Sequence, residues 1–224
     1  MTAPGWAPDP IPPGDRAGVH AEVRRQLGIP DDALVFGIVG SLGWVRRAGY
    51  CYGLELVRAM EKVDRPDVYA LIVGDGTGKA RLDALAGKVS GARCVLTGRV
   101  PREEVPRHLA AMDVASLPQI LDGVGLFRYS TKLAEYLAAG LPVVTGRLPM
   151  AFDLDNGWLW RLPGEAPWAS RSIEALAALM GQVAPAELAS KRFAVPPAPP
   201  EFDRGRQVAR VAAFLRELMA DREG

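Results

Sequence analysis

Residues that build disulfides and metal centres are scarce in this 224-residue chain. Its two cysteines, Cys51 and Cys94, are far apart and form no CxxC pair, so the sequence excludes a disulfide framework and favours a reducing compartment. Two histidines, His20 and His108, are too few for a histidine-built metal centre. We therefore expect a protein that binds no metal and needs no separate cofactor.

An excess of charge of either sign is also missing. The 27 Lys and Arg residues balance 26 Asp and Glu residues to a net charge of +1, which argues against a nucleic-acid partner held by bulk charge. No apolar run approaches the roughly 18–20 residues that span a bilayer. The opening MTAPGWAPDPIPPGD has neither the basic nor the apolar segment of a secretory signal. We expect a cytoplasmic protein without a transmembrane segment, or, for the full-length protein, one held peripherally on the inner membrane face.

What the chain does have is a regular alternation of short apolar runs and helical patterns. With 49% hydrophobic residues, a chain of this length can bury a sizeable core. The apolar runs cover residues 34–40, 69–73, 94–97, 114–117 and 142–145, and the helical patterns cover about 53–62, 78–88, 102–111 and 131–139. Such alternation is typical of βαβ units with right-handed crossovers. The predicted fold is an α/β, Rossmann-like, doubly wound parallel sheet with helices on both faces.

A proline- and glycine-rich lead-in opens the chain. It precedes a short helix for which Asp15 is the expected N-cap and Gly28 the expected stop. After the last buried run, residues 157–162 are expected to form an edge strand and residues 170–182 a helix.

The C-terminal part combines a stiff connector with an amphipathic helix. Residues 195–200, VPPAPP, can form neither helix nor central strand. The expected last helix, about 204–221, has an apolar stripe, which predicts that it docks on the body of the protein. The stripe comprises Val208, Val211, Ala212, Leu215, Leu218 and Met219. The expected divisions of the chain are 1–29, 30–182 and 183–224.

Glycine-containing loops follow the predicted strands, at the edge where open α/β sheets bind ligands. The loop 40–47, GSLGWVRR, holds two arginines that could pair with phosphate, or it is a surface turn with solvated arginines. The loop 74–78, GDGTG, could present backbone N–H groups to an anion, or it is a tight turn with Thr77 as N-cap. Gly98 and Arg99 follow the third strand, where Arg99 could face a ring or a phosphate.

The strongest signal is the loop and helix that begin at Asp122. Ser130 and Thr131 can cap a helix whose first N–H groups have no intrahelical partner. Lys132 lies in the first turn, where the helix dipole disfavours a cation, and a bound anion would remove that conflict. Glu135 lies one turn further in, where its carboxylate could meet a ribose. The alternatives are a dipole-favoured surface acid and a solvated lysine.

Residues from about 30 to 180 resemble the C-terminal, donor-binding half of GT-B glycosyltransferases of the retaining family 4 type. The most specific part is TKLAEYLAAGLPVV, residues 131–144, which is similar to the family's SPTKxxEYxAxGxPVV segment. VGDG at 73–76, LTGRV at 96–100 and AMDV at 111–114 add to the resemblance through their order and spacing.

The resemblance implies a nucleoside-diphosphate sugar as the ligand. Glu135 would hold the ribose hydroxyls, the loop after Gly98 would lie against the base, and N–H groups around residues 130–132 would meet the diphosphate. The implied function is transfer of a hexosyl group, with retention of its anomeric configuration, to an unknown acceptor. The candidate donor-binding residues are Gly40, Ser41, Arg46, Arg47, Gly74, Gly98, Arg99, Arg128, Ser130, Thr131, Lys132 and Glu135.

Two features of the family pattern are missing within the site: its pair of basic residues and its first acidic residue. The family's Gly-Arg and Lys-Gly pairs, whose basic residues clamp the diphosphate, correspond here to Gly40-Ser41 and Tyr52-Gly53. The candidate substitutes for these basic residues are Arg46, Arg47, Arg128 and Lys132. Phe127 stands at the first acidic position of the family's E-x7-E pattern.

A third departure concerns the acceptor half. GWAPDP at 5–10 resembles the family's interdomain linker, and a complete enzyme would need roughly another 150–200 residues. We therefore expect a truncated form, a fragment or a stand-alone relative that transfers sugar poorly without an acceptor domain in the same or another chain. Two further functions stay open: a non-catalytic nucleotide-binding or interaction domain of the same fold, and one half of a GT-B-type sugar-nucleotide epimerase.

Overall fold

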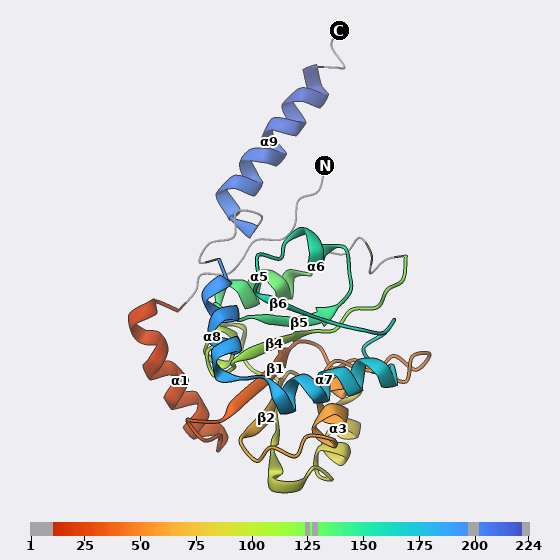
Figure 1. Ribbon diagram of the computed structural model, residues 1–224. Helices are drawn as coiled ribbons and strands as arrows, with labels where there is room; N and C mark the ends of the chain where they lie inside the picture. The colour runs from red at the N-terminus through yellow and green to blue at the C-terminus, as the bar shows by residue number, and fades with distance from the viewer. Residues whose placement is uncertain (1–10, 124–125, 127–129, 197–201, 221–224) are drawn as a thin grey trace.

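The computed structural model, which describes residues 11–123, 126, 130–196 and 202–220, contains one helix-flanked parallel sheet (Figure 1). The strands are β1 (Leu34–Val39), β2 (Val68–Val73), β3 (Cys94–Gly98), β4 (Val114–Leu117), β5 (Val143–Gly146) and β6 (Leu159–Leu162). The five apolar runs and the expected edge strand are therefore confirmed as strands.

The sheet has the order β3–β2–β1–β4–β5–β6, and every neighbouring pair is parallel. The chain starts in the middle at β1, runs outward to β3, and then returns to place β4 on the other side of β1. This reversal is a topological switch point, and its crevice lies beyond the carboxyl ends of β1 and β4.

Helices cover both faces of the sheet. They are α1 (Pro13–Leu27), α2 (Leu54–Met60), α3 (Lys79–Ala86), α4 (Val105–Ala110), α5 (Thr131–Ala138), α6 (Met150–Asp153), α7 (Ser170–Gln182), α8 (Pro185–Ala194) and α9 (Arg204–Ala220), with short 3₁₀ turns at Ser90–Ala92 and Arg102–Glu104. Leu109 of α4 and Leu133 of α5 share one buried cluster with part of α1, whereas Leu56 of α2 and Leu82 of α3 share another with α7. Because both faces are covered, β1 is buried at every position, as its continuous apolar run predicts.

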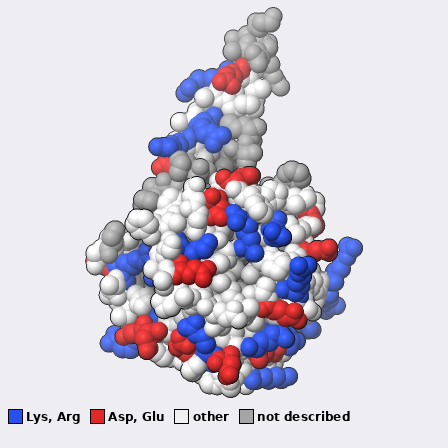
Figure 2. All heavy atoms as spheres, viewed as in Figure 1, with Lys and Arg blue, Asp and Glu red and all other residues white. Residues whose placement is uncertain are grey.

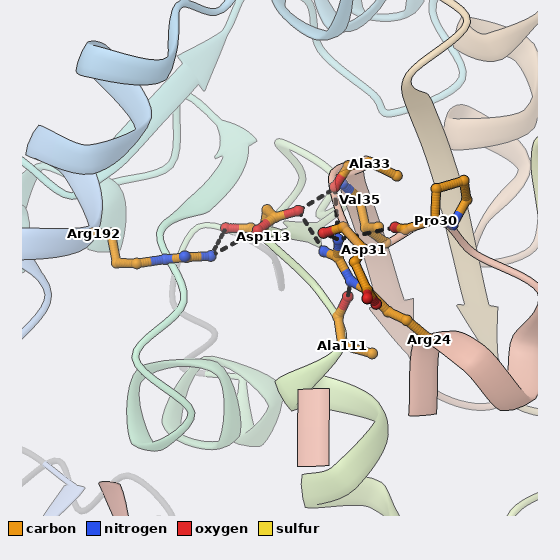
Figure 3. Close-up of polar contacts among 8 residues, drawn as sticks. All are labelled: Arg24, Pro30, Asp31, Ala33, Val35, Ala111, Asp113 and Arg192. Carbon is orange, nitrogen blue, oxygen red and sulfur yellow. Dashed lines mark hydrogen bonds and ion pairs between the residues drawn. The ribbon is translucent and has the colours of Figure 1, made fainter. Parts of the chain in front are cut away.

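A buried ionic network joins two helices and two strands at the amino end of the sheet (Figure 3). The Arg24 side chain is only 1% exposed and donates to the Asp113 carboxylate at 2.7 Å. It also donates to four backbone carbonyls, of Ala111 (3.0 Å), Pro30 (3.4 Å), Asp31 (2.9 Å) and Ala33 (2.7 Å). Asp113 in turn accepts from the Val35 N–H at 2.8 Å and from Arg192 of α8 at 3.0 Å. These bonds tie α1 and α8 to the starts of β1 and β4.

The first helix begins earlier than its sequence suggests. Its first residue is Pro13, with Pro12 at the N-cap position, so the expected Asp15 cap is wrong and Asp15 lies in the first turn. The fixed φ of proline suits the start of a helix, and this preference prevails over the capping carboxylate. The stop is confirmed, since Gly28 adopts the left-handed conformation with φ 68°.

The C-terminal part holds two differences from the sequence-based expectation. A helix, α8, occupies Pro185–Ala194, where the sequence analysis expected only a connector. The expected docking of the last helix is wrong: α9 projects from the body (Figure 1), and Val208, Leu215 and Met219 are 54%, 53% and 66% exposed. Amphipathic spacing predicts a helix with an apolar face but not which surface covers that face.

Charges on the surface are mixed. Figure 2 shows Lys and Arg interspersed with Asp and Glu over the visible face of the body, in keeping with the net charge of +1. Among the described residues, no helix is both long enough and apolar enough to cross a membrane.

Candidate functional site

Three of the candidate glycines meet at the carboxyl ends of β1, β2 and β3. The Gly40 N–H donates to the Val73 carbonyl at 2.9 Å, and the Gly74 N–H donates to the Gly98 carbonyl at 3.0 Å. Gly74 has φ 145°, and a Cβ atom there would overlap the Gly40 carbonyl oxygen. Glycine is therefore required at 74 by the close approach of two backbones.

The GDGTG loop is a tight turn that packs against the loop after β1. The Leu42 N–H donates to the Asp75 carbonyl at 2.9 Å, and the Gly78 N–H donates to the Leu42 carbonyl at 2.8 Å. Thr77 is not the N-cap of α3, because Gly78 holds that position. Its hydroxyl instead accepts from the Trp44 N–H at 2.9 Å, which links the two loops.

A cavity of about 390 Å³ opens at the switch point. One wall is the loop between β1 and α2, and the opposite wall is the loop after β4. The lining residues are Ser41, Gly43, Val45, Tyr50, Cys51, Tyr52, Pro118, Gln119, Ile120, Asp122 and Pro167. Two tyrosine rings and a few polar groups in one concave site are typical of a small-molecule pocket.

Helix α5 presents the two charged candidates at this edge. Leu133, Ala134 and Tyr136 face the core, and the Tyr136 hydroxyl accepts from the Val39 N–H at 3.3 Å, which anchors α5 to the end of β1. Ser130 is confirmed at the N-cap position by its extended backbone, but its side chain forms no capping hydrogen bond. The same packing leaves Lys132 and Glu135 outside the core.

Lys132 lies across the end of β1. A Cβ atom on Gly40 would lie 2.6 Å from Lys132 Cε, so an alanine at 40 would make the end of this side chain move. The ammonium sits 4.5 Å from the centroid of the Tyr52 ring, at cation–π distance. Lys132 and Tyr52, 80 positions apart in the sequence, therefore meet beside the cavity.

Glu135 is a partly buried carboxylate between two cations. Burial raises its pKa above the ordinary value, because a low-dielectric surrounding disfavours the ionised form. The positive charges of Lys132 and Arg102 oppose that rise. Arg102 comes from the 3₁₀ turn after β3, so a charge on the segment that follows Gly98 acts on Glu135.

The remaining candidate residues lie at several places around Lys132, Glu135 and the cavity. Arg46 and Arg47 are exposed on the loop that the Val45–Tyr50 bridge closes, and neither lines the cavity. Arg99 is exposed directly after Gly98, at the far side of β1 from the cavity. Thr131 is exposed at the first position of α5, and Ser41 lines the cavity. Arg128 and Phe127 lie outside the described residues.

The sequence analysis missed a buried acid behind the cavity. Glu55 of α2 is 3% exposed and accepts from the Tyr50 hydroxyl at 2.8 Å, the Gly53 N–H at 3.1 Å and the Ser116 hydroxyl at 3.1 Å. Burial raises the pKa of this carboxyl group. Its only signal in the sequence is an acid in the first helical turn after Gly53, which is common on exposed helices as well. In the described parts of the chain, no three His, Cys, Asp or Glu side chains are grouped so as to hold a metal ion.

Known proteins share both the sequence and the fold of this region. Residues 33–181 match the family described as glycosyl transferases group 1. The 2-deoxystreptamine glucosyltransferase of Streptomyces kanamyceticus is 27% identical over 207 residues, which are 89% of this chain and 48% of the relative. The D-inositol 3-phosphate glycosyltransferase of Stackebrandtia nassauensis is 30% identical over 182 residues, 76% of this chain and 39% of the relative. The chain thus spans about half, or less, of the length of these curated relatives.

Solved structures agree at the level of the fold. Anabaena HepE in complex with UDP and glucose has a TM-score of 0.66 at 20% identity, over 94% of this chain and 55% of its own. Sucrose-phosphate synthase from Thermosynechococcus elongatus also has a TM-score of 0.66 at 20% identity, over 96% of this chain and 52% of its own. Both share the Rossmann-like, helix-flanked sheet of GT-B glycosyltransferases. By sequence and by fold, the chain belongs to the glycosyl transferases group 1 family.

Proposed function

We propose that this chain is the donor-binding half of a retaining glycosyltransferase. It binds a nucleoside-diphosphate sugar and takes part in transferring the hexosyl group to an acceptor. The observation that carries this proposal is that Lys132 and Glu135 lie three residues apart on α5, with the Lys132 ammonium over the ring of Tyr52, which lines a cavity at the switch point of the sheet.

Glu135 is proposed to bind the ribose. An ionised carboxylate accepts hydrogen bonds from two adjacent hydroxyl groups, and the partial burial of Glu135 limits competition from water. The base would then lie against Gly98 and Arg99, since Arg102 of the same loop is close enough to act on the Glu135 charge.

Lys132 is proposed to meet the diphosphate, together with the backbone around Ser130 and Thr131. Departure of the sugar leaves negative charge on the diphosphate, and a fixed cation at that point stabilises the transition state. The remaining contribution of the chain is to hold the donor in one orientation. We propose that an acceptor domain, in the same or another chain, closes over this edge and excludes water.

The names of relatives support a hexosyl donor but differ in the base. The Streptomyces kanamyceticus relative is a glucosyltransferase, HepE was solved with UDP and glucose, and a Mycolicibacterium smegmatis relative is a GDP-mannose-dependent mannosyltransferase. We leave the base and the acceptor open and use both UDP and GDP as probes.

Calorimetric titration with UDP and GDP, each compared with its nucleoside, tests the proposed function. We expect one of the diphosphates to bind the wild-type chain and to bind more tightly than its nucleoside. EDTA should leave the affinity unchanged, because the charges proposed to meet the diphosphate belong to the chain. Binding of neither diphosphate would contradict the proposal and favour an interaction domain of the same fold, and loss of binding in EDTA would show that a metal takes part.

A further inference from the structure

We propose that Tyr52 is a positioning residue that fixes the Lys132 ammonium at the end of β1 as a phosphate-binding charge. This inference rests on the proposed function. The four residues that carry it are Gly40, Tyr50, Tyr52 and Lys132.

Lys132 stands at an unfavourable place for a cation. It is the second residue of α5, where the partial positive charge of the helix N-terminus repels an ammonium group. The Tyr52 ring face, 4.5 Å from Nζ, offers the negative side of its quadrupole at that point. The ring therefore favours one position of the ammonium.

Space for this arrangement comes from Gly40. A Cβ atom at 40 would lie 2.6 Å from Lys132 Cε and 3.0 Å from its Nζ, and 3.5 Å from the Tyr52 ring. Because Gly40 has no side chain, the Lys132 side chain can lie directly over the backbone at the end of β1. The ammonium is held close to the Gly40 backbone, beside the loop that carries Ser41.

The Tyr52 ring is itself held in place by neighbouring aromatic residues. It meets Tyr50 edge-to-face, with centroids 6.3 Å apart, and Tyr50 packs on Trp168 at 4.8 Å. Tyr50 is buried, and its hydroxyl donates to the fully buried Glu55 at 2.8 Å. Glu55 thus holds Tyr50 by a hydrogen bond, Tyr50 packs against Tyr52, and Tyr52 lies under the Lys132 ammonium.

The two arginines of the same loop do not reach this position. Arg46 and Arg47 are exposed and do not line the cavity, whereas Tyr52 does. Among the candidate substitutes that the structure describes, Lys132 is thus the cation at the switch point. Recognition of the phosphates, as distinct from the base and ribose, should depend on its position.

The test measures the ratio of nucleoside-diphosphate affinity to nucleoside affinity, by calorimetry, for UDP and GDP with uridine and guanosine. Tyr52→Leu should lower this ratio by roughly two- to thirtyfold, since an interaction of about 0.5–2 kcal/mol is removed. Tyr52→Phe, which keeps the ring, should retain the wild-type ratio. Phe152→Leu is the matched control. Arg161 lies 4.5 Å from the centroid of the Phe152 ring, the same distance as in the Lys132–Tyr52 pair, and neither residue lines the cavity.

A double-mutant cycle separates positioning from a structural role. In a Lys132→Met background, Tyr52→Leu should leave the ratio unchanged, because the charge that Tyr52 positions has been removed. An equal loss of diphosphate and nucleoside affinity, or a further loss in the Lys132→Met background, would overturn the inference. Should Tyr52→Leu fail to fold, Tyr52→Phe and Gly40→Ala decide: the first must keep the ratio, and the second must lower it by displacing Lys132. Binding of neither diphosphate by the wild type would overturn the proposed function, whereas wild-type binding with a ratio indifferent to Tyr52 would overturn this inference alone.

Discussion

The two ends of the sheet use charged residues in opposite ways. At the amino end, Arg24 and Asp113 are buried together, and their hydrogen bonds go to each other, to Arg192 and to the backbone. At the carboxyl end, Lys132 lies over the ring of Tyr52 at the edge of a cavity, and burial raises the pKa of Glu135 on the same helix. The first arrangement stabilises the fold, and the second places charged side chains at the edge where a ligand is proposed to bind. Substitutions at the two ends should therefore separate stability from binding.

The largest expected effect is on stability, at the amino end. Asp113→Asn leaves the Arg24 guanidinium buried without its counter-charge, which should lower the free energy of unfolding by about 3–5 kcal/mol. Denaturant unfolding measures this loss. Glu61→Gln is the matched control: it breaks the exposed Arg58–Glu61 pair, whose removal should cost at most about 1 kcal/mol.

Nucleotide affinity completes that test of the amino end. Below the unfolding transition, Asp113→Asn should bind a nucleoside diphosphate like the wild type. A variant that keeps its stability but loses affinity would contradict the division between the two ends.

The next effect is on binding, at the carboxyl end. Glu135→Gln should weaken nucleotide binding roughly ten- to hundredfold, because a hydrogen bond to a charged acceptor contributes about 1.5–3 kcal/mol. Calorimetry and thermal melting, done together, check this. A fall in both affinity and melting temperature at neutral pH would assign Glu135 a structural role instead.

A smaller effect concerns the pH dependence of stability. Burial raises the Glu135 pKa, so the folded state binds more protons than the unfolded state between the two pKa values. The contribution of this group to stability is thus present below the unfolded pKa and is lost as pH rises through the folded pKa. Glu135→Gln should equal or exceed the wild type in stability at neutral pH, and the difference should vanish in acid. A variant that is less stable than the wild type at neutral pH would contradict the sign of this shift.

The smallest effect is expected at α9, which contrasts with α5. Both helices are amphipathic, but α5 buries its apolar face and α9 exposes most of its own. Truncation after Gln207, which keeps the buried Phe202 and Gln207, should change the free energy of unfolding by less than about 1 kcal/mol. A cooperative loss of several kcal/mol would show that α9 packs on the body in solution.

The strands could be predicted because each is short, apolar and bounded by glycine or proline. The α5 segment could be placed because its charged residues stand in a dense local motif. These sequence patterns are local, and they depend directly on which residues are buried and which residues favour turns.

Contacts set by topology could not be predicted in the same way. Tyr52 and Lys132 meet only because β1 and β4 are neighbours, and no periodicity in either segment reports that pairing. The position of Glu55 behind the cavity depends equally on Ser116 of β4. For α9, the apolar stripe predicts a helix with an apolar face but not the surface that covers it. For α8, nearby prolines argue against a helix, yet the helix begins at one of them, Pro185.

The central claim is that Glu135 binds a ribose at the switch point. The most direct test titrates the wild type and Glu135→Gln with the bound nucleoside diphosphate and with its 2′,3′-dideoxy analogue. We expect the wild type to bind the ribonucleotide roughly ten- to hundredfold more tightly than the analogue, and Glu135→Gln to bind both with the same, lower affinity. Equal binding of the two ligands by the wild type would contradict the claim.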